Sequence, residues 1–130
     1  MVLDTSALLA VLLNEPEAAA FRLAIEADPV RLLSAATLVE TAIVIEARVG
    51  DVGGRELDRA LHKADVKVVA VDVDQAELAR HAFRKFGKGR HPAGLNYGDC
   101  FSYALAHSTG EPLLFKGHDF SQTDITAVKV

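Results

Sequence analysis

Short apolar segments alternate along this chain with longer segments whose apolar residues recur at helical spacing. The segments "MVL", "RLLS", "VKVVAVDV" and "PLLF" have the character of buried strands, and helical segments separate them. Strands joined through helices pair in parallel, with right-handed connections that place helices on both faces of the sheet. We therefore predict an α/β fold, a three-layer sandwich with a central, mainly parallel sheet flanked by helices. The sheet has four strands, or five if the terminal segment "TAVKV" joins it.

The expected helices follow from apolar spacing and from residues that start or stop helices. They cover residues 6–13, 17–27, 36–49, 53–64, 74–87 and 96–108. Gly50 is placed to end the third helix, and Asp74 with Glu77 forms a predicted capping box at the start of the fifth. No linker, internal repeat or low-complexity tract interrupts this order.

The length of the chain, 130 residues, is typical of one domain, and we predict a single domain over residues 1–130. Half of the residues are hydrophobic, but no apolar run approaches the roughly 20 residues that span a bilayer. The first residues lack the basic stretch and cleavage pattern of a secretory signal, so we expect a cytoplasmic protein with no membrane partner. Cys100 and the scattered histidines lack the spacing of a zinc site.

A basic segment stands out in a chain whose formal net charge is −4. This segment, "FRKFGKGRH" at residues 83–91, carries Arg84, Lys85, Lys88 and Arg90 around two glycines. Cations near a helix C-terminus favour the helix dipole, so a solvated helix end is one interpretation. The other is binding of a phosphate backbone, which proteins contact mainly through Lys and Arg. The residues alone leave both open.

Four acidic residues are predicted to lie at one edge of the sheet. Asp4 ends the first strand, and Asp119 follows the strand "PLLF". Glu40 and Asp99 lie near the starts of two helices. Sites in parallel α/β sheets form beyond the carboxyl ends of the strands. Carboxylates gathered there repel one another unless a cation joins them, and Mg²⁺ or Mn²⁺ suits such oxygen ligands. A metal of this kind can activate water and stabilise charge on a phosphodiester.

Each of these acids also has a purely structural explanation. Asp4 can cap the helix that it precedes, and Asp119 can be an ordinary turn residue. The other two stand three residues after a capping residue, in the pairs Thr37 with Glu40 and Asn96 with Asp99. Taken one at a time, the acids therefore do not decide between helix capping and a shared chemical site.

Four segments of the sequence resemble, in order and spacing, the four motif regions of PIN-domain ribonucleases. They are "VLDTSALLA", "LVETAIVIEAR", "LNYGDCFSYALA" and "PLLFKGHDF". The resemblance is in particular to VapC-type toxins of bacterial type II toxin–antitoxin systems, for which "GLNYGDC" and "LLFKGHDF" are specific. It extends from Met1 to about Asp124, which is nearly the whole chain.

The resemblance implies a magnesium-dependent endoribonuclease with a PIN-like fold. Motif matching fills the four acidic positions with Asp4, Glu40, Asp99 and Asp119, of which Asp4 and Asp99 are expected to contact the metal directly. Thr5 or Ser6 matches the polar position that supports such a site through its hydroxyl or through water. Asp124 is the alternative to Asp119 as the fourth acid.

The resemblance also implies partners. With an RNA substrate, the expected phosphate contacts are Lys88, Arg90 and Lys116. A small VapB-type antitoxin restrains toxins of this kind, and the likeness implies a homodimer and a toxin–antitoxin hetero-oligomer. The apolar side chains near the N-terminus, at Leu8, Leu12, Phe21 and Ile25, are expected in the core. A groove for an antitoxin helix is the alternative.

Two other classes of function fit the sequence less well. A metal-dependent, phosphatase-like α/β domain also gathers aspartates at strand ends, but Asp4 is followed by Thr5 and Ser6 where a haloacid-dehalogenase-type phosphatase has D-x-D. A non-catalytic domain that binds RNA or an antitoxin would keep the acids for metal binding or structure. RNA cleavage that requires metal and is lost in Asp99→Asn would separate the nuclease from both.

Overall fold

The sheet consists of four parallel strands in the order β3-β2-β1-β4. The computed structural model describes all residues from Met1 to Val130. Its strands are β1 (Val2–Leu3), β2 (Leu32–Ser34), β3 (Lys67–Val69) and β4 (Leu113–Leu114). Val2 pairs with Leu32 on one side and with Leu113 on the other, so β1 is a central strand. The predicted parallel α/β sheet is confirmed.

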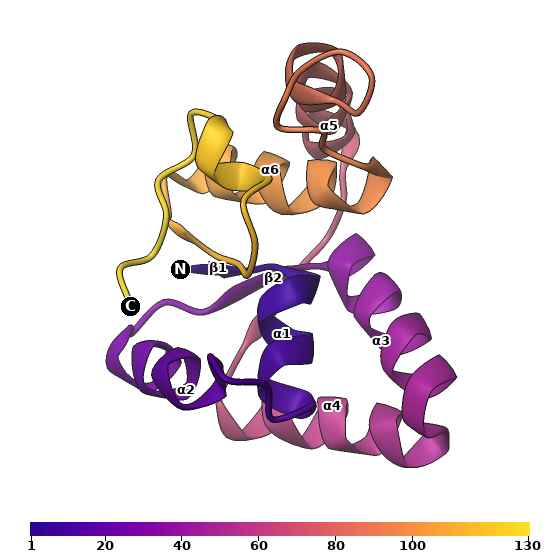
Figure 1. Ribbon diagram of the computed structural model, residues 1–130, viewed down its shortest axis with the longest axis vertical. Helices are drawn as coiled ribbons and strands as arrows, with labels where there is room; N and C mark the ends of the chain where they lie inside the picture. The colour runs from indigo at the N-terminus through magenta and orange to yellow at the C-terminus, as the bar shows by residue number, and fades with distance from the viewer.

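Six α-helices and one short 3-10 helix surround the sheet (Figure 1). They are α1 (Thr5–Leu12), α2 (Ala18–Ala27), α3 (Ala35–Val49), α4 (Asp51–Lys63), α5 (Val73–Phe86), α6 (Tyr97–Thr109) and η1 (Phe120–Gln122). Helices α5 and α6 lie on one side of the sheet, and α1 to α4 lie on the other (Figure 1). This is the predicted three-layer sandwich. None of the helices combines the length and the apolar character needed to cross a bilayer.

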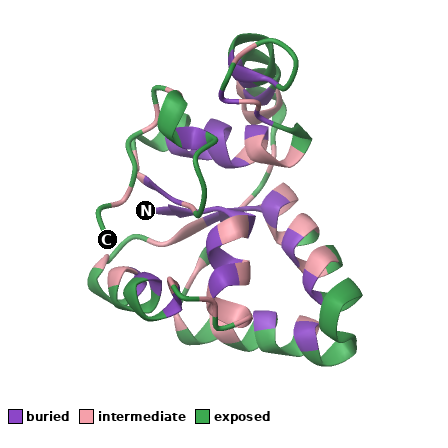
Figure 2. Ribbon diagram, in the orientation of Figure 1, coloured by how far each residue is buried: buried purple, intermediate pink, exposed green.

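The side chains of β1 alternate between two hydrophobic cores, as expected for a strand covered on both faces. Val2 packs in the core beneath α5 and α6, together with Ala82 and Ala104. Leu3 packs in the other core, together with Phe21 of α2. Figure 2 shows the buried residues on the inward faces of the helices and along the strands. The two cores fix β1, and with it the position of the residue that follows.

The apolar side chains near the N-terminus divide between core and surface. Leu8, Phe21 and Ile25 are buried in the core beneath α1 and α2, which confirms their expected place. Leu12 is half-buried and packs against that core from its edge. It lies where the core meets solvent.

Two strand predictions were too long. The segment 66–73 forms a strand only at Lys67–Val69, because β3 is an edge strand and pairs with a three-residue β2. The terminal segment "TAVKV" makes a single parallel bridge between Ala127 and Leu113 and does not form a fifth strand. The backbone of Leu113 accounts for both hydrogen bonds of that bridge, with Thr126 and Val128.

The capping box predicted for Asp74 and Glu77 is wrong. Helix α5 begins at Val73, and its cap is Asp72, whose carboxylate accepts a hydrogen bond of 2.8 Å from the backbone N–H of Gln75. Asp72 adopts an extended conformation and so is the last residue before the helix. Asp74 therefore lies inside the first turn.

The capping box predicted for Thr37 and Glu40 is also wrong. Helix α3 begins at Ala35 and is capped by Ser34, whose hydroxyl accepts a hydrogen bond of 3.3 Å from the backbone N–H of Ala36. Both predicted partners thus lie within the helix, and the carboxylate of Glu40 is not needed to cap it. It is available for other contacts.

Candidate active site

The four predicted acids meet at the carboxyl end of the sheet, which we call the acidic edge. Asp4 follows β1, Asp119 follows β4, Glu40 lies in α3 and Asp99 lies in the first turn of α6. Their proximity appears in the electrostatics of one carboxyl group, that of Asp99. Its pKa is raised to about 7, mainly by burial, and the charges of the other three acids raise it as well. A hydrogen bond from the backbone N–H of Asn96 opposes this rise.

Asp4 is held by three hydrogen bonds in a site where only 3% of its surface is exposed. The backbone N–H and the hydroxyl of Ser6 donate to its Oδ2, at 3.0 and 2.6 Å. The hydroxyl of Ser102 donates to its Oδ1, at 2.6 Å. Asp4 thus caps α1, as its structural explanation required, and its carboxylate is fixed at the end of β1. Capping and membership of a shared site are compatible.

Ser102 is a site residue that the sequence predictions missed. It lies three residues after Asp99 in α6, on the same face of the helix. Its side chain is fully buried and also lies 3.3 Å from the hydroxyl of Thr37. The spacing from Asp99 was the available signal, since a buried serine one turn after an acid reaches the same edge.

Glu40 is oriented by a second set of hydroxyls. The hydroxyl of Thr5 donates to its Oε1 at 2.5 Å, and the hydroxyl of Thr41 donates to that of Thr5 at 3.1 Å. Thr41 is buried and was not predicted as a site residue. Thr5 and Ser6, which were offered as alternatives, therefore have separate partners. One supports Glu40 and the other supports Asp4.

Gly98 lets α6 approach Glu40 closely. A Cβ atom at this position would overlap the Glu40 carboxylate, so no larger residue fits without displacing it. Asn96 and Asp99 form the predicted capping box on the same turn. The backbone N–H of Asp99 donates to Asn96 Oδ1 at 2.9 Å, and that of Asn96 donates to Asp99 Oδ2 at 3.0 Å. Asp99 Oδ1 accepts no hydrogen bond and is available for another ligand.

The two candidates for the fourth acid have different surroundings. Asp119 precedes η1, makes no side-chain capping bond and contributes to the raised pKa of Asp99. Asp124 instead accepts a hydrogen bond of 2.7 Å from the hydroxyl of Tyr103, and the ammonium of Lys85 lies 4.0 Å from it. These contacts attach the C-terminal loop to α5 and α6. They give Asp124 a structural role away from the acidic edge.

The ligands that the acidic edge offers fit a hard divalent cation. All are carboxylate or hydroxyl oxygens, which suit Mg²⁺ or Mn²⁺ better than metals that prefer nitrogen or sulfur. No three acidic, histidine or cysteine side chains form a ready-made metal cage. Mg²⁺ does not need one, because it commonly keeps several waters and binds one or two carboxylates. A cation would also relieve the repulsion that raises the pKa of Asp99.

The predicted RNA contacts differ in whether their charge is compensated. Lys88 and Arg90 in the basic segment form no ion pair. Lys116 does, because its ammonium lies 3.3 Å from the carboxylates of both Glu15 and Glu17. The structure therefore leaves two of the three cations unpaired, and it ties the third to the end of α1.

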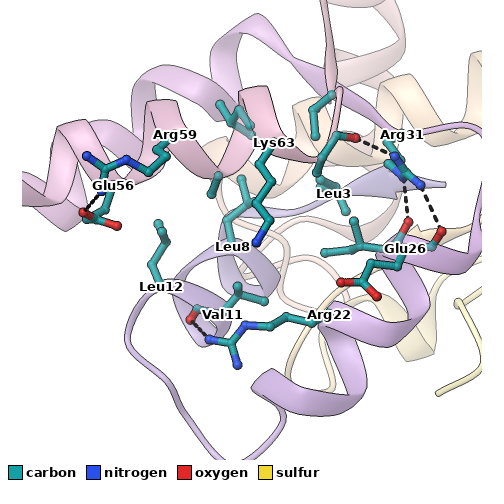
Figure 3. A pocket seen from close by; sticks show the side chains of 15 residues that line it. Leu3, Leu8, Val11, Leu12, Arg22, Glu26, Arg31, Glu56, Arg59 and Lys63 are labelled. Atoms are coloured by element: carbon teal, nitrogen blue, oxygen red, sulfur yellow. Dashed lines mark hydrogen bonds and ion pairs between the residues drawn. The ribbon is translucent and has the colours of Figure 1, made fainter.

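A concave region lies between α1, α2 and α4. We call it the apolar groove; its volume is about 560 Å³. Figure 3 shows Leu8, Val11 and Leu12 of α1 facing it. Charged side chains form its rim, four of them cationic (Arg22, Arg31, Arg59 and Lys63) and two acidic (Glu26 and Glu56). It combines an apolar floor with a rim of net positive charge.

Comparisons with known proteins place the chain in a family. The sequence pattern of the PIN domain matches residues 1–125. The ribonuclease VapC30 of Mycobacterium tuberculosis is 63% identical over 128 residues, which cover 98% of each chain. A ribonuclease VapC of Mycolicibacterium smegmatis is 62% identical over 128 residues, which cover 98% of this chain and 99% of the relative.

Solved structures agree at the level of the fold. VapC20 of Mycobacterium tuberculosis, described as a toxin that cleaves the sarcin-ricin loop, superimposes with a TM-score of 0.81 at 22% identity, covering 99% of this chain and 98% of that one. A toxin–antitoxin complex from Klebsiella pneumoniae gives a TM-score of 0.70 at 19% identity, covering 95% and 92%. With the family pattern and the high identity to its relatives, the chain belongs to the PIN-domain family, within the group of VapC ribonucleases.

Proposed function

We propose that this protein is an endoribonuclease toxin that hydrolyses RNA at the acidic edge, with Mg²⁺ held by Asp4 and Asp99. The observation that carries the proposal is the convergence of four acids, seen in the effect of three of them on the pKa of Asp99. Asp119 is the fourth acid in this proposal, because Asp124 is already bonded to Tyr103. Mn²⁺ is the expected substitute, since it accepts the same oxygen ligands.

The reaction adds a water oxygen to the phosphorus atom of an RNA phosphodiester and breaks one phosphorus–oxygen ester bond. When bound, the metal activates that water and offsets negative charge on the phosphate. Ser6 and Ser102 keep Asp4 in place through hydrogen bonds, so its carboxylate need not reorganise. Thr5 holds one oxygen of Glu40, and the other oxygen accepts no hydrogen bond from the protein, so it is the one that can accept a hydrogen bond from the attacking water.

RNA binding requires cations, because a row of phosphates approaches an edge that carries four acids. Lys88 and Arg90 are the proposed phosphate contacts, since neither is neutralised by a carboxylate. Lys116 stays a predicted contact, but its two glutamate partners already compensate its charge. We assign it the smallest share of binding.

The test is cleavage of RNA by the purified protein with Mg²⁺, with Mn²⁺ and with a chelator. We expect cleavage with either metal, none with the chelator and none for Asp99→Asn. Asp124→Asn is the matched control, because it removes a carboxylate but keeps an acceptor for the Tyr103 hydroxyl. It should cleave as the unmodified protein does. Cleavage that persists in the chelator or in Asp99→Asn would contradict the proposal.

We also propose that a cognate VapB-type antitoxin inserts an amphipathic helix into the apolar groove. Helix-in-groove binding needs an apolar floor for one face of the helix, which Leu8, Val11 and Leu12 provide. The net positive rim favours a helix that carries Asp or Glu beside its apolar face. The solved toxin–antitoxin complex of the same fold supports a partner of this class.

Copurification with a co-expressed antitoxin tests this surface. Leu12→Ser and Lys63→Glu should weaken the complex, because they remove part of the floor and reverse one charge of the rim. Leu23→Ser is the control, since Leu23 is an exposed leucine of α2 outside the groove. All three variants should still cleave RNA. Retention of the antitoxin by both groove variants would exclude the groove as its binding site.

The homodimer, the hetero-oligomer and the cytoplasmic location stay predictions.

A further inference from the structure

A second groove lies between α5 and α6, next to the acidic edge, and the proposed reaction does not use it. Its volume is about 540 Å³, within the usual range for small-ligand sites. The small side chains of Ala76 and Ala79 form part of its lining, and three aromatic rings border it, those of Phe83, Tyr97 and Phe101. We call it the aromatic groove. It combines flat apolar surfaces with two arginines, Arg80 and Arg84.

Tyr97 is unusually exposed for an aromatic residue at a helix start. It is 79% exposed, although its ring packs edge-to-face on Phe101 with the ring centres 4.9 Å apart. Phe83, across the groove on α5, is 37% exposed. Large aromatic side chains usually bury more of their surface, so exposed rings beside one groove mark a binding surface.

Cations surround these rings. Arg84 lines the groove and has no carboxylate partner, whereas Arg80 is paired with Glu77 at 2.9 Å. The guanidinium of Arg90, from the basic segment, lies 6.0 Å from the centre of the Phe83 ring. Aromatic rings next to unpaired arginines form the combination that proteins use for single-stranded nucleic acids, in which bases stack and phosphates meet cations.

The position of the groove links it to the acidic edge. Tyr97 and Asp99 lie in the first turn of α6, but they are two residues apart and so point to different sides of the helix. Cys100, the residue after Asp99, is buried and itself lines the groove, so the groove adjoins the turn that carries Asp99. A nucleotide chain whose phosphate lies at Asp99 would have to pass around the N-terminus of α6 to bring one of its bases onto Tyr97.

We propose that the aromatic groove is a subsite for an unpaired nucleobase of the RNA, next to the phosphodiester that is cut. The base stacks on Tyr97, and Arg84 and Arg90 contact the flanking phosphates. This inference rests on the proposed ribonuclease function and adds that the RNA must be single-stranded at the cut. Association of a second copy of this chain through the same groove is the alternative, which the sedimentation measurement below tests.

The experiment compares two ligands of equal charge, a short oligoadenylate and an abasic ribose-phosphate oligomer of the same length. Both are titrated into the full chain carrying Asp99→Asn, so that the RNA is bound but not cut. We expect the oligoadenylate to bind about tenfold more tightly than the abasic oligomer, which is the size of effect that one stacked base gives. Adding Tyr97→Ala should remove this preference without changing the affinity for the abasic oligomer. Tyr97→Phe should retain it.

Two further measurements separate stacking from other causes. The chain contains no tryptophan, so Tyr97→Trp introduces a single fluorophore at the groove. The oligoadenylate should quench it and the abasic oligomer should not. Replacing Arg84 and Arg90 with alanine should instead weaken both ligands alike. Sedimentation of Tyr97→Ala checks whether the groove joins two copies, and we expect its association state to be unchanged.

The subsite is overturned if the oligoadenylate has no advantage, if Tyr97→Ala leaves the advantage intact, or if that variant changes association state without changing RNA affinity. Cleavage by the unmodified protein is measured in parallel. A base preference that depends on Tyr97 in a protein that cuts no RNA would contradict the proposed function and keep the subsite. Cleavage with no base preference would support the proposed function and overturn the subsite.

Discussion

The acidic edge and the basic segment, whose Lys88 is hydrogen-bonded to Leu95 just before α6, are organised in opposite ways. At the acidic edge, hydroxyl groups hold the carboxylates in place, as Ser102 holds Asp4 and Thr5 holds Glu40. In the basic segment, Lys88 and Arg90 extend from a loop without ion-pair partners. Catalytic groups benefit from fixed geometry, whereas contacts to a flexible strand need only charge and reach. Substitutions at the acidic edge should therefore have large effects on kcat that depend on geometry. Substitutions in the basic segment should have smaller effects on RNA affinity that depend on salt.

The largest effect is expected from Asp4→Asn. The amide keeps the shape of the side chain but removes a metal-binding charge and presents an N–H group toward one of its hydroxyl donors. We expect kcat to fall about a thousandfold, comparable with the loss of a major transition-state contact. Single-turnover cleavage with saturating protein measures it. A loss below about tenfold would mean that the carboxylate is only a helix cap.

A smaller loss is expected from Ser102→Ala, which keeps Asp4 but removes its hydrogen bond at Oδ1. Residues that orient a metal ligand commonly contribute about 10-fold to 100-fold, and we expect a loss of kcat in this range. Raising the Mg²⁺ concentration should recover part of the activity. Ser108→Ala, further along the same helix and remote from Asp4, is the control. Equal activity of the two variants would show that Asp4 needs no support from α6.

In the basic segment, replacing Lys88 and Arg90 together with alanine should change binding but not the chemical step. Two lost phosphate contacts on a single strand reduce the slope of log K against log salt by about 1.4. Affinity should fall at low salt, and kcat at saturating RNA should stay unchanged. Fluorescence anisotropy at several salt concentrations gives the slope. An unchanged slope would leave only the interpretation of a solvated helix end.

The smallest effect concerns stability without metal. Because the pKa of Asp99 is about 7 in the folded state and its ordinary value is 3.8, the unfolded chain loses its proton first as the pH rises. This group's contribution to the free energy of unfolding therefore falls between about pH 4 and pH 7 and is constant above pH 7. In Asp99→Asn the side chain does not ionise, so this fall in the free energy of unfolding is absent. The amide oxygen still accepts the hydrogen bond from the Asn96 N–H.

Melting curves in chelator measure this difference. We expect the variant to be more stable than the unmodified protein at pH 8, by about 5 °C in Tm, with little difference at pH 4. The same variant therefore loses activity and gains stability. A pH-independent difference between the two proteins would contradict the raised pKa of Asp99, which burial and the three neighbouring acids cause.

The sequence predicts the members of the site better than the contacts that fix them. Asp4 could be placed at a strand end because the apolar segment before it is short and ends abruptly. Asp99 could be placed in a first helical turn because Asn96 is a strong capping residue. Both predictions depend only on neighbouring residues, and both match the structure.

Other features depend on residues far apart in the chain. Ser102 reaches Asp4 across 98 positions, and Lys116 reaches Glu15 across 101. Packing between elements decides these pairs, and no local pattern encodes them. The wrong capping box at Asp74 has a different cause. Asp72 is an equally good cap two residues earlier, and the choice between two local signals is made by where β3 ends and α5 packs.

Calorimetric titration of Mg²⁺ into the protein without RNA tests most directly whether the acids form one site. At pH 7 about half of the Asp99 carboxyl groups carry a proton, so metal binding should release protons and its heat should depend on the buffer. We expect this signal for the unmodified protein and for Asp124→Asn, and no binding with Asp99→Asn. Equal Mg²⁺ affinity of Asp99→Asn and the unmodified protein would contradict the account.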